Sequence, residues 1–99
     1  MSSELAEKMK AIREAEGLSQ SKFSEITGIS ISTIKKYETG VKDPGSRTLL
    51  KVTTHPEYKK YTMWLMSDET NEAAGQISPA LSPDGQKNIS NRQNGQKAG

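Results

Sequence analysis

Two short segments with helical periodicity meet at Gly28, and no other feature of the sequence constrains its fold as strongly. Glycine adopts the positive φ that a sharp turn between two helices requires, at no steric cost. Each segment begins directly after a serine, Ser19 or Ser30, a residue type that caps helix N-termini. Ser24 lies one turn before the junction and is small enough to let two helices approach closely. The junction therefore predicts two short helices that cross steeply.

The two segments also divide into inner and outer faces. Apolar residues at helical spacing face inward from both segments: Phe23, Ile29, Ile34 and Tyr37. The second segment is left with an outer face formed by Ile31, Ser32, Lys35 and Lys36. An exposed, partly basic helix packed across another helix is typical of the helix-turn-helix arrangement, in which the second helix enters the major groove of DNA.

The flanking sequence predicts three further helices and hence an all-α domain. Residues 3–16 form an amphipathic pattern that ends at Gly17. After the turn "VKDPG", a helix carries Leu49, Leu50 and Val52 and ends near Thr54. A last helix, "EYKKYTMWLM", follows a proline near its first helical position.

Large apolar side chains are concentrated before residue 67, and after it only Ile77, Leu81 and Ile89 remain. A segment rich in Gly, Ser, Pro, Asn and Gln buries too little apolar surface to offset the ordering of its backbone. We therefore expect a helix-turn-helix domain at residues 1–66, whose last helix serves dimerisation, and a low-complexity, disordered tail at residues 67–99 whose beginning could dock on the domain.

The composition excludes several classes of function. The chain has no cysteine and one histidine, so we expect no metal site and no cofactor, and no nucleophile–base pair indicates an enzyme. No apolar run approaches the ~20 residues of a membrane span, and the N-terminus lacks a signal-peptide pattern. These features predict a cytoplasmic protein without a membrane partner and without an evident small-molecule effector. Residues 22–60 hold eight Lys and Arg against four Asp and Glu, a net charge of +4 that suits either nucleic-acid binding or a solvated surface.

The stretch "IREAEGLSQSKFSEITGISISTIKKYETGVKDP", continuing to "LLKV", resembles the Cro and lambda-repressor type of helix-turn-helix domain, the XRE-like family. The matching elements are Arg13, "GLSQ", Phe23, "GIS", Ile34, "YETG", Pro44 and "LLKV". The resemblance covers roughly residues 5–54. It implies a compact five-helix, lambda-repressor-like fold with a flexible C-terminal tail, in a bacterial or phage-encoded regulator that binds double-stranded DNA.

The resemblance also implies roles for individual positions. Base contacts fall to Gln20, Ile31, Ser32 and Lys36. Contacts with the DNA backbone fall to Ser19, Lys22, Thr33, Lys35, Thr39, Gly40 and Lys42. Arg13 and Glu38 match a largely buried structural ion pair.

Two of the base-reading positions leave alternatives open. Ile31 stands where a polar reader is common, and it either contacts a thymine methyl group or folds back onto the core. Lys36 either donates to O6 and N7 of guanine or contacts a phosphate. The family usually has alanine at the position of Ser24, which is small enough to preserve the helix crossing.

A single helix-turn-helix unit reads only a few base pairs, so we expect a homodimer whose half-sites lie ~34–36 Å apart. The last predicted helix has more large apolar side chains than its own domain can bury. We expect Tyr61 and Leu65 to cap the core, and the dimer interface to be formed by Tyr58, Met63, Trp64 and Met66.

The predicted function is that of a sequence-specific, Cro-like transcriptional regulator, a repressor that binds a short inverted-repeat operator as a dimer. Activation by contact with polymerase is equally compatible with the sequence. The alternative from another class is an antitoxin or protein-binding adaptor, in which the helix-turn-helix fold is retained and the tail binds a partner protein.

Overall fold

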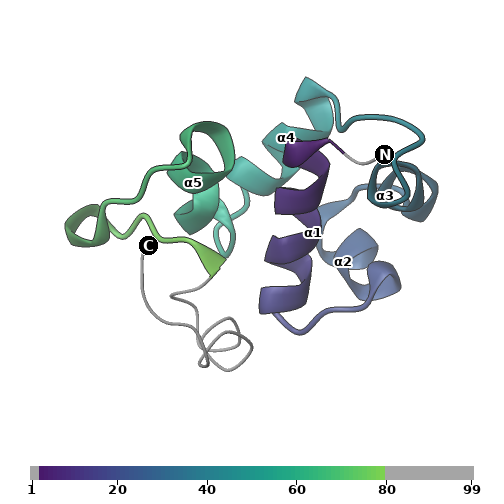
Figure 1. Cartoon of the computed structure of the whole chain (residues 1–99). Coiled ribbons are helices and arrows are strands. Elements are labelled where there is room, and N and C mark those ends of the chain that lie inside the picture. Colours follow the sequence, from purple (N-terminus) through teal and green to yellow (C-terminus); the bar gives the residue numbers. More distant parts are fainter. Residues whose placement is uncertain (1–2, 80–99) are drawn as a thin grey trace.

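The computed structural model describes residues 3–79, which form five α-helices and two 3₁₀ helices (Figure 1). In chain order these are α1 (Glu4–Ala15), α2 (Gln20–Thr27), α3 (Ile31–Glu38), α4 (Ser46–Thr53), η1 (Lys59–Tyr61), α5 (Thr62–Ser67) and η2 (Glu72–Ala74). Within this part of the chain, β-structure is limited to one isolated bridge. The predicted all-α, five-helix fold is thereby confirmed. No helix of the described residues is long and apolar enough to cross a membrane.

Local chemistry sets the ends of the first three helices. The hydroxyls of Ser3, Ser19 and Ser30 each accept a hydrogen bond from the backbone N–H three residues later, which satisfies an otherwise unpaired donor of each helix. Gly28 ends α2 with a φ of +81°, and its N–H donates to the carbonyl of Ser24. α3 therefore starts in a new direction within three residues of the end of α2.

One apolar core joins all five helices. α3 packs against both α2 and α1, and α5 packs against α1 and η1. The buried residues of this core are Ala6, Met9, Ile12, Phe23, Ile29, Ile34, Tyr37, Val52, Tyr58, Tyr61 and Leu65. Tyr61 and Leu65 thus lie in the core, as the sequence predicts.

The last α-helix begins later than predicted. Residues 54–58 form turns and a bend, and η1 comes before α5, so the segment after Pro56 does not continue as one helix. The Nδ1 atom of His55 accepts from the Glu57 N–H (3.1 Å), a local bond that competes with helix formation. The His55 and Tyr58 rings stack with centroids 4.6 Å apart, which fixes this turn.

Tyr58 is a core residue of the protomer and not part of an exposed interface. Its side chain is 1% exposed, and its ring centroid lies 5.7 Å from that of Phe23. This position corrects its predicted assignment to the dimer surface, because a side chain already enclosed by its own protomer has no area left for a partner.

Residues beyond α5 return to the body of the molecule. The Ile77 N–H donates to the carbonyl of Lys60 (2.8 Å), and the Ile77 side chain packs against the core. Residues 80–99, most of the predicted tail, lie outside the described part of the chain, and the boundary at residue 66 stays a prediction.

Candidate nucleic-acid interface

α3 presents one face to the core and the other to solvent. Ile34 and Tyr37 are buried against the rest of the domain. The opposite face is exposed and consists of Ile31, Ser32, Lys35 and Lys36, the residues that the sequence places there. Ile31 is 36% exposed, so its side chain does not fold back into the core. The outer face of α3 is therefore open to a ligand along its whole length.

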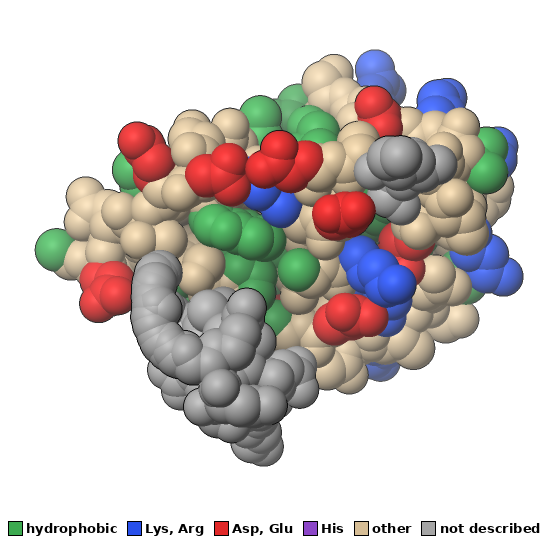
Figure 2. Space-filling model, viewed as in Figure 1, with side chains coloured by type: hydrophobic (Ala, Val, Ile, Leu, Met, Phe, Trp, Pro, Cys, Tyr) green, Lys and Arg blue, Asp and Glu red, His purple; other side chains and the backbone are tan. Residues whose placement is uncertain are grey.

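Basic side chains gather around this face. Residues 31–51 hold five Lys and Arg against two Asp and Glu. Lys35, Lys36 and Lys42 are exposed, and none of them forms an ion pair with another residue of the described region. Figure 2 shows Lys and Arg side chains collected toward the α3 end of the molecule, while Asp and Glu side chains lie mainly over α1 and α5.

A polar hollow lies between α3 and the start of α4. It is lined by Thr33, Lys36, Lys42, Asp43, Gly45 and Thr48. Three residues with predicted DNA contacts, Thr33, Lys36 and Lys42, thus border the same depression. The two ammonium groups outnumber the one carboxylate of this lining, that of Asp43, so the hollow carries a net positive charge that attracts anions such as phosphate.

The end of α3 is held by hydrogen bonds within the protein. The Thr39 hydroxyl donates to the Lys35 carbonyl (2.7 Å), and the Gly40 N–H donates to the Tyr37 carbonyl (3.2 Å). Gly40 has a φ of +83°, which turns the chain away from the helix. Its predicted role was a contact between backbone and phosphate, but its N–H is already bonded in the free protein.

Two further residues with predicted DNA contacts, Ser19 and Lys22, lie at the start of α2. The Ser19 hydroxyl caps α2 by accepting from the Lys22 N–H (3.0 Å). The Lys22 ammonium pairs with Glu25 (3.1 Å), and both side chains are mostly exposed. An exposed pair of this kind is worth ~0–1 kcal/mol, so a phosphate could replace Glu25 at little cost.

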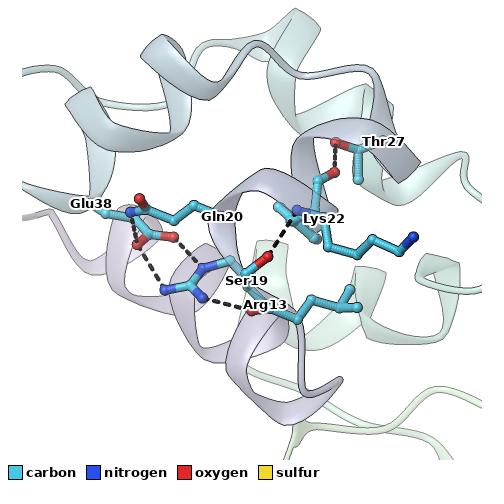
Figure 3. A network of polar contacts seen from close by, with 8 residues as sticks. Arg13, Ser19, Gln20, Lys22, Thr27 and Glu38 are labelled. Atoms are coloured by element: carbon cyan, nitrogen blue, oxygen red, sulfur yellow. Dashed lines mark hydrogen bonds and ion pairs between the residues drawn. The ribbon is translucent and has the colours of Figure 1, made fainter.

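A buried polar network fixes α3 relative to α1 and α2 (Figure 3). The Arg13 guanidinium donates from Nε to Glu38 Oε2 (2.8 Å) and from Nη2 to Oε1 (3.0 Å). Its Nη1 donates to the carbonyl of Leu18 (2.7 Å), just before α2. The two charged side chains are 12% and 4% exposed. Hydrogen bonding to Glu38 raises the pKa of Arg13 above its ordinary value, so the pair stays charged.

Gln20 joins this network, a contact that the sequence did not predict. Its Nε2 donates to Glu38 Oε1 at 2.9 Å. An ionised carboxylate only accepts hydrogen bonds, so the NH₂ end of the amide must face Glu38. The side chain that the sequence assigns to base reading is therefore held in one orientation at the start of α2.

Comparison with known proteins agrees with this geometry. The profile of the helix-turn-helix family matches residues 9–55. The chain is 33% identical over 99 residues to Repressor protein C of Escherichia phage P2, and the alignment covers 100% of both chains. The chain belongs to the helix-turn-helix family. The resemblance to the Cro and lambda-repressor type seen in the sequence is thereby confirmed.

Within the helix-turn-helix motif, α2 and α3 are the two crossing helices, and α3 is the one that such proteins place in the major groove. A residue from outside the motif supports its turn. Lys51 of α4 donates from Nζ to the carbonyl of Gly28 (3.0 Å), at the junction of the two helices. Sequence reasoning missed this contact because a lysine 23 residues from the turn carries no local signal.

Three residues of the predicted dimer surface remain accessible on α5. Met66 is 56% exposed, and Met63 and Trp64 are half-buried. Lys8 of α1 lies over the Trp64 ring, with Nζ 5.4 Å from the ring centroid. Figure 1 places α5 at the end of the molecule away from α3, so the helix-turn-helix motif and this surface do not overlap.

Proposed function

We propose that this protein is a transcriptional repressor that inserts α3 into the major groove of an operator and blocks access to a promoter. The observation that carries the proposal is the exposed outer face of α3. Its two lysines form no ion pair with the described residues, while its inner face packs against α1 and α2. The relative from phage P2 is named a repressor, which supports the sign of regulation. The site of action is the cytoplasm of a bacterial cell, where the operator is found.

Direct reading of bases falls to Ile31, Ser32 and Lys36. Lysine donates to guanine O6 and N7, and an exposed isoleucine contacts a thymine methyl group. Gln20, which donates one N–H to Glu38, keeps its second N–H and its carbonyl oxygen for a contact with a base. Phosphate contacts come from the residues around the motif: Ser19, Lys22, Thr33, Lys35, Thr39 and Lys42. Gly40 is left out of this set because its N–H is bonded to the Tyr37 carbonyl.

Tight binding requires two copies of the motif. In this proposal the homodimer forms through Met63, Trp64 and Met66 of α5 and recognises a short inverted repeat. The half-sites then lie one helical turn of DNA, ~34–36 Å, or a multiple of it, apart. Light scattering of the intact protein tests the dimer, and a monomer at high micromolar concentration would exclude it.

The operator is sought in the DNA that flanks the gene. Footprinting at several salt concentrations should protect a discrete site, and the complex should survive excess competitor DNA. Binding that is weak, equal on all sequences and abolished by moderate salt would instead reflect phosphate contacts alone. That outcome would reject the repressor and favour the protein-binding adaptor.

Variants of the two lysines that line the hollow distinguish a contact with a base from a contact with the DNA backbone. Lys36→Ala should cost ~1–3 kcal/mol of binding and relax specificity at one base pair, because it removes a direct contact. Lys42→Ala should weaken binding to all sequences alike and reduce the salt dependence by about one phosphate contact. Selection from a randomised half-site measures both effects. Since both side chains are exposed, unchanged thermal unfolding serves as the control.

An equal loss of affinity on every sequence for both variants would reject Lys36 as a base reader. It would leave DNA binding itself in place.

A further inference from the structure

α5 is too short to hold its own position. It has six residues, and an isolated helix shorter than ~12–15 residues is marginal in water. No side chain of its N-cap residue, Tyr61, caps it. The orientation of α5, and of the exposed side chains that it carries, must therefore come from groups outside the helix.

Gln76 holds the N-terminal end of α5. Its Oε1 accepts from the backbone N–H of Met63 (3.0 Å), and its Nε2 donates to the carbonyl of Lys59 (3.0 Å). A backbone N–H needs an acceptor and a carbonyl needs a donor, so both ends of the amide are satisfied in only one orientation. Gln76 thus joins η1 to the first turn of α5 and supplies the cap that α5 lacks.

The backbone of Gln76 is itself fixed on the body of the molecule. Its N–H and carbonyl exchange hydrogen bonds with Asn71 at 2.9 and 2.8 Å, closing the turn that contains η2. The next residue, Ile77, bonds to Lys60 and packs against the core. The amide is therefore presented to α5 from a closed and anchored loop.

Lys8 holds the C-terminal end of α5. Its Nζ donates to the carbonyls of Trp64 (3.1 Å) and Leu65 (3.5 Å) and pairs with Asp68 (2.6 Å). The Lys8 side chain is only 11% exposed. An acceptor at the N-terminus of a helix and a cation at its C-terminus are the arrangement that the helix dipole favours. The two remote side chains thus act on the two ends of α5 with matching polarity.

We infer that Gln76 and Lys8 are positioning residues for homodimerisation, which clamp α5 by its two ends so that Met63, Trp64 and Met66 meet a second copy of the chain in register. The inference rests on the dimer of the proposed function. Neither Lys8 nor Gln76 belongs to the helix-turn-helix motif. The inference therefore gives the loop of residues 71–77, which follows α5, a role in dimerisation.

The test uses the full chain and its single tryptophan, Trp64, which reports on α5 directly. Gln76→Ala removes two hydrogen bonds of ordinary strength and should raise the dimer dissociation constant about tenfold. Lys8→Met removes two hydrogen bonds and the ion pair with Asp68, and should raise this constant at least as much. Acrylamide quenching of Trp64 should rise in Gln76→Ala. This readout is taken from Gln76→Ala alone, because Lys8 lies over the Trp64 ring and its replacement changes quenching directly. Binding to a duplex with a single half-site should stay within twofold of the unmodified protein. The matched control is Glu72→Ala, an exposed side chain of the same loop that makes none of these bonds.

Each result decides a separate point. If both variants dimerise like the unmodified protein and Gln76→Ala is quenched like it, the clamp is rejected and the dimer stands. If the unmodified protein is itself monomeric, the proposed dimer is rejected, and with it the role in dimerisation. Should Gln76→Ala fail to fold, Gln76→Glu replaces it, because its carboxylate keeps the acceptor for the Met63 N–H and lacks the donor. Dimerisation by this variant as tight as that of the unmodified protein would overturn the proposal.

Discussion

At the scale of single residues, Arg13 does most to fix the motif, because it bonds both Glu38 of α3 and the carbonyl just before α2. Arg13→Ala takes the positive charge away from the nearly buried Glu38 carboxylate, and we expect the free energy of unfolding to fall by ~3–5 kcal/mol. Urea denaturation followed by circular dichroism measures this change. The accompanying loss of DNA binding would come from unfolding, since the Arg13 side chain is largely buried and bonded within the protein.

The double variant Arg13→Met with Glu38→Leu is the control for this effect. It replaces the pair by apolar groups of similar size, and such replacements are often neutral or stabilising. A single variant that loses less than ~1 kcal/mol would place the pair among ordinary surface contacts.

The buried hydroxyl of Tyr37 should make the stability of the protein depend on pH in the alkaline range. This hydroxyl has no hydrogen-bond partner among the described residues. Burial raises the pKa of this hydroxyl well above its ordinary value of ~10. The folded state thus keeps the proton that the unfolded state releases above pH ~10, so stability is complete below that pH and falls as pH rises further.

Tyr37→Phe removes an unsatisfied polar atom and keeps the ring. We expect unchanged or slightly higher stability at pH 7, because no hydrogen bond is lost. The decline above pH ~10 should become shallower, since one ionisable group is gone. Thermal unfolding between pH 7 and 11 measures both. A loss above ~1.5 kcal/mol at pH 7 would show that the hydroxyl does have a partner.

At the scale of elements, the turn between α2 and α3 depends on the backbone of Gly28. A Cβ built at this position meets no atom within 4 Å, so a side chain has space and only the φ of +81° opposes it. Gly28→Ala should therefore lower the free energy of unfolding by ~1–2 kcal/mol. Gly28→Asn should lower it less, because asparagine tolerates this conformation. Equal losses for both would mean that space, not φ, limits the position.

Elements whose ends depend on neighbouring residues could be predicted from the sequence, whereas those that depend on distant residues could not. Serine caps and glycine turns act within four residues, and these signals place both ends of α1 and α2 and the start of α3 to within one residue. The start of α5 was misplaced because Tyr58 is drawn into a core made by distant residues. The bonds of Gln20 to Glu38, of Lys51 to Gly28 and of Gln76 to Met63 span 13–23 residues and leave no periodic trace.

At the scale of the whole molecule, the two proposed surfaces lie at opposite ends. Figure 1 places α3 at one end and α5 at the other, and the longest dimension is 34 Å. A dimer formed through α5 therefore places the two α3 helices at the outer ends of the assembly. Acidic side chains lie mainly over α1 and α5, and basic ones gather toward α3 (Figure 2), so most carboxylates lie away from the proposed DNA face.

A dimer of this shape fixes the spacing of the half-sites, which gives the last prediction. Inserting five base pairs between the half-sites turns one of them to the opposite face of the duplex, because ten to ten and a half pairs make one turn. We expect affinity to fall about a hundredfold or more, to the level of a single half-site, as the benefit of the second contact is lost. Gel shifts on spacer variants measure this loss, with a duplex carrying one half-site as the reference.

Inserting a full turn separates a rigid dimer from a flexible pair of domains. The half-sites then face the same side again but lie ~34–36 Å further apart, so a dimer held by a clamped α5 should not regain its affinity. Recovery of affinity would mean that the two motifs move independently of each other. That result would contradict a rigid interface formed by α5.

Reversing one half-site tests the symmetry of the dimer in the same gel-shift assay. A two-fold dimer should lose affinity on the direct repeat, and undiminished binding there would exclude the inverted-repeat operator.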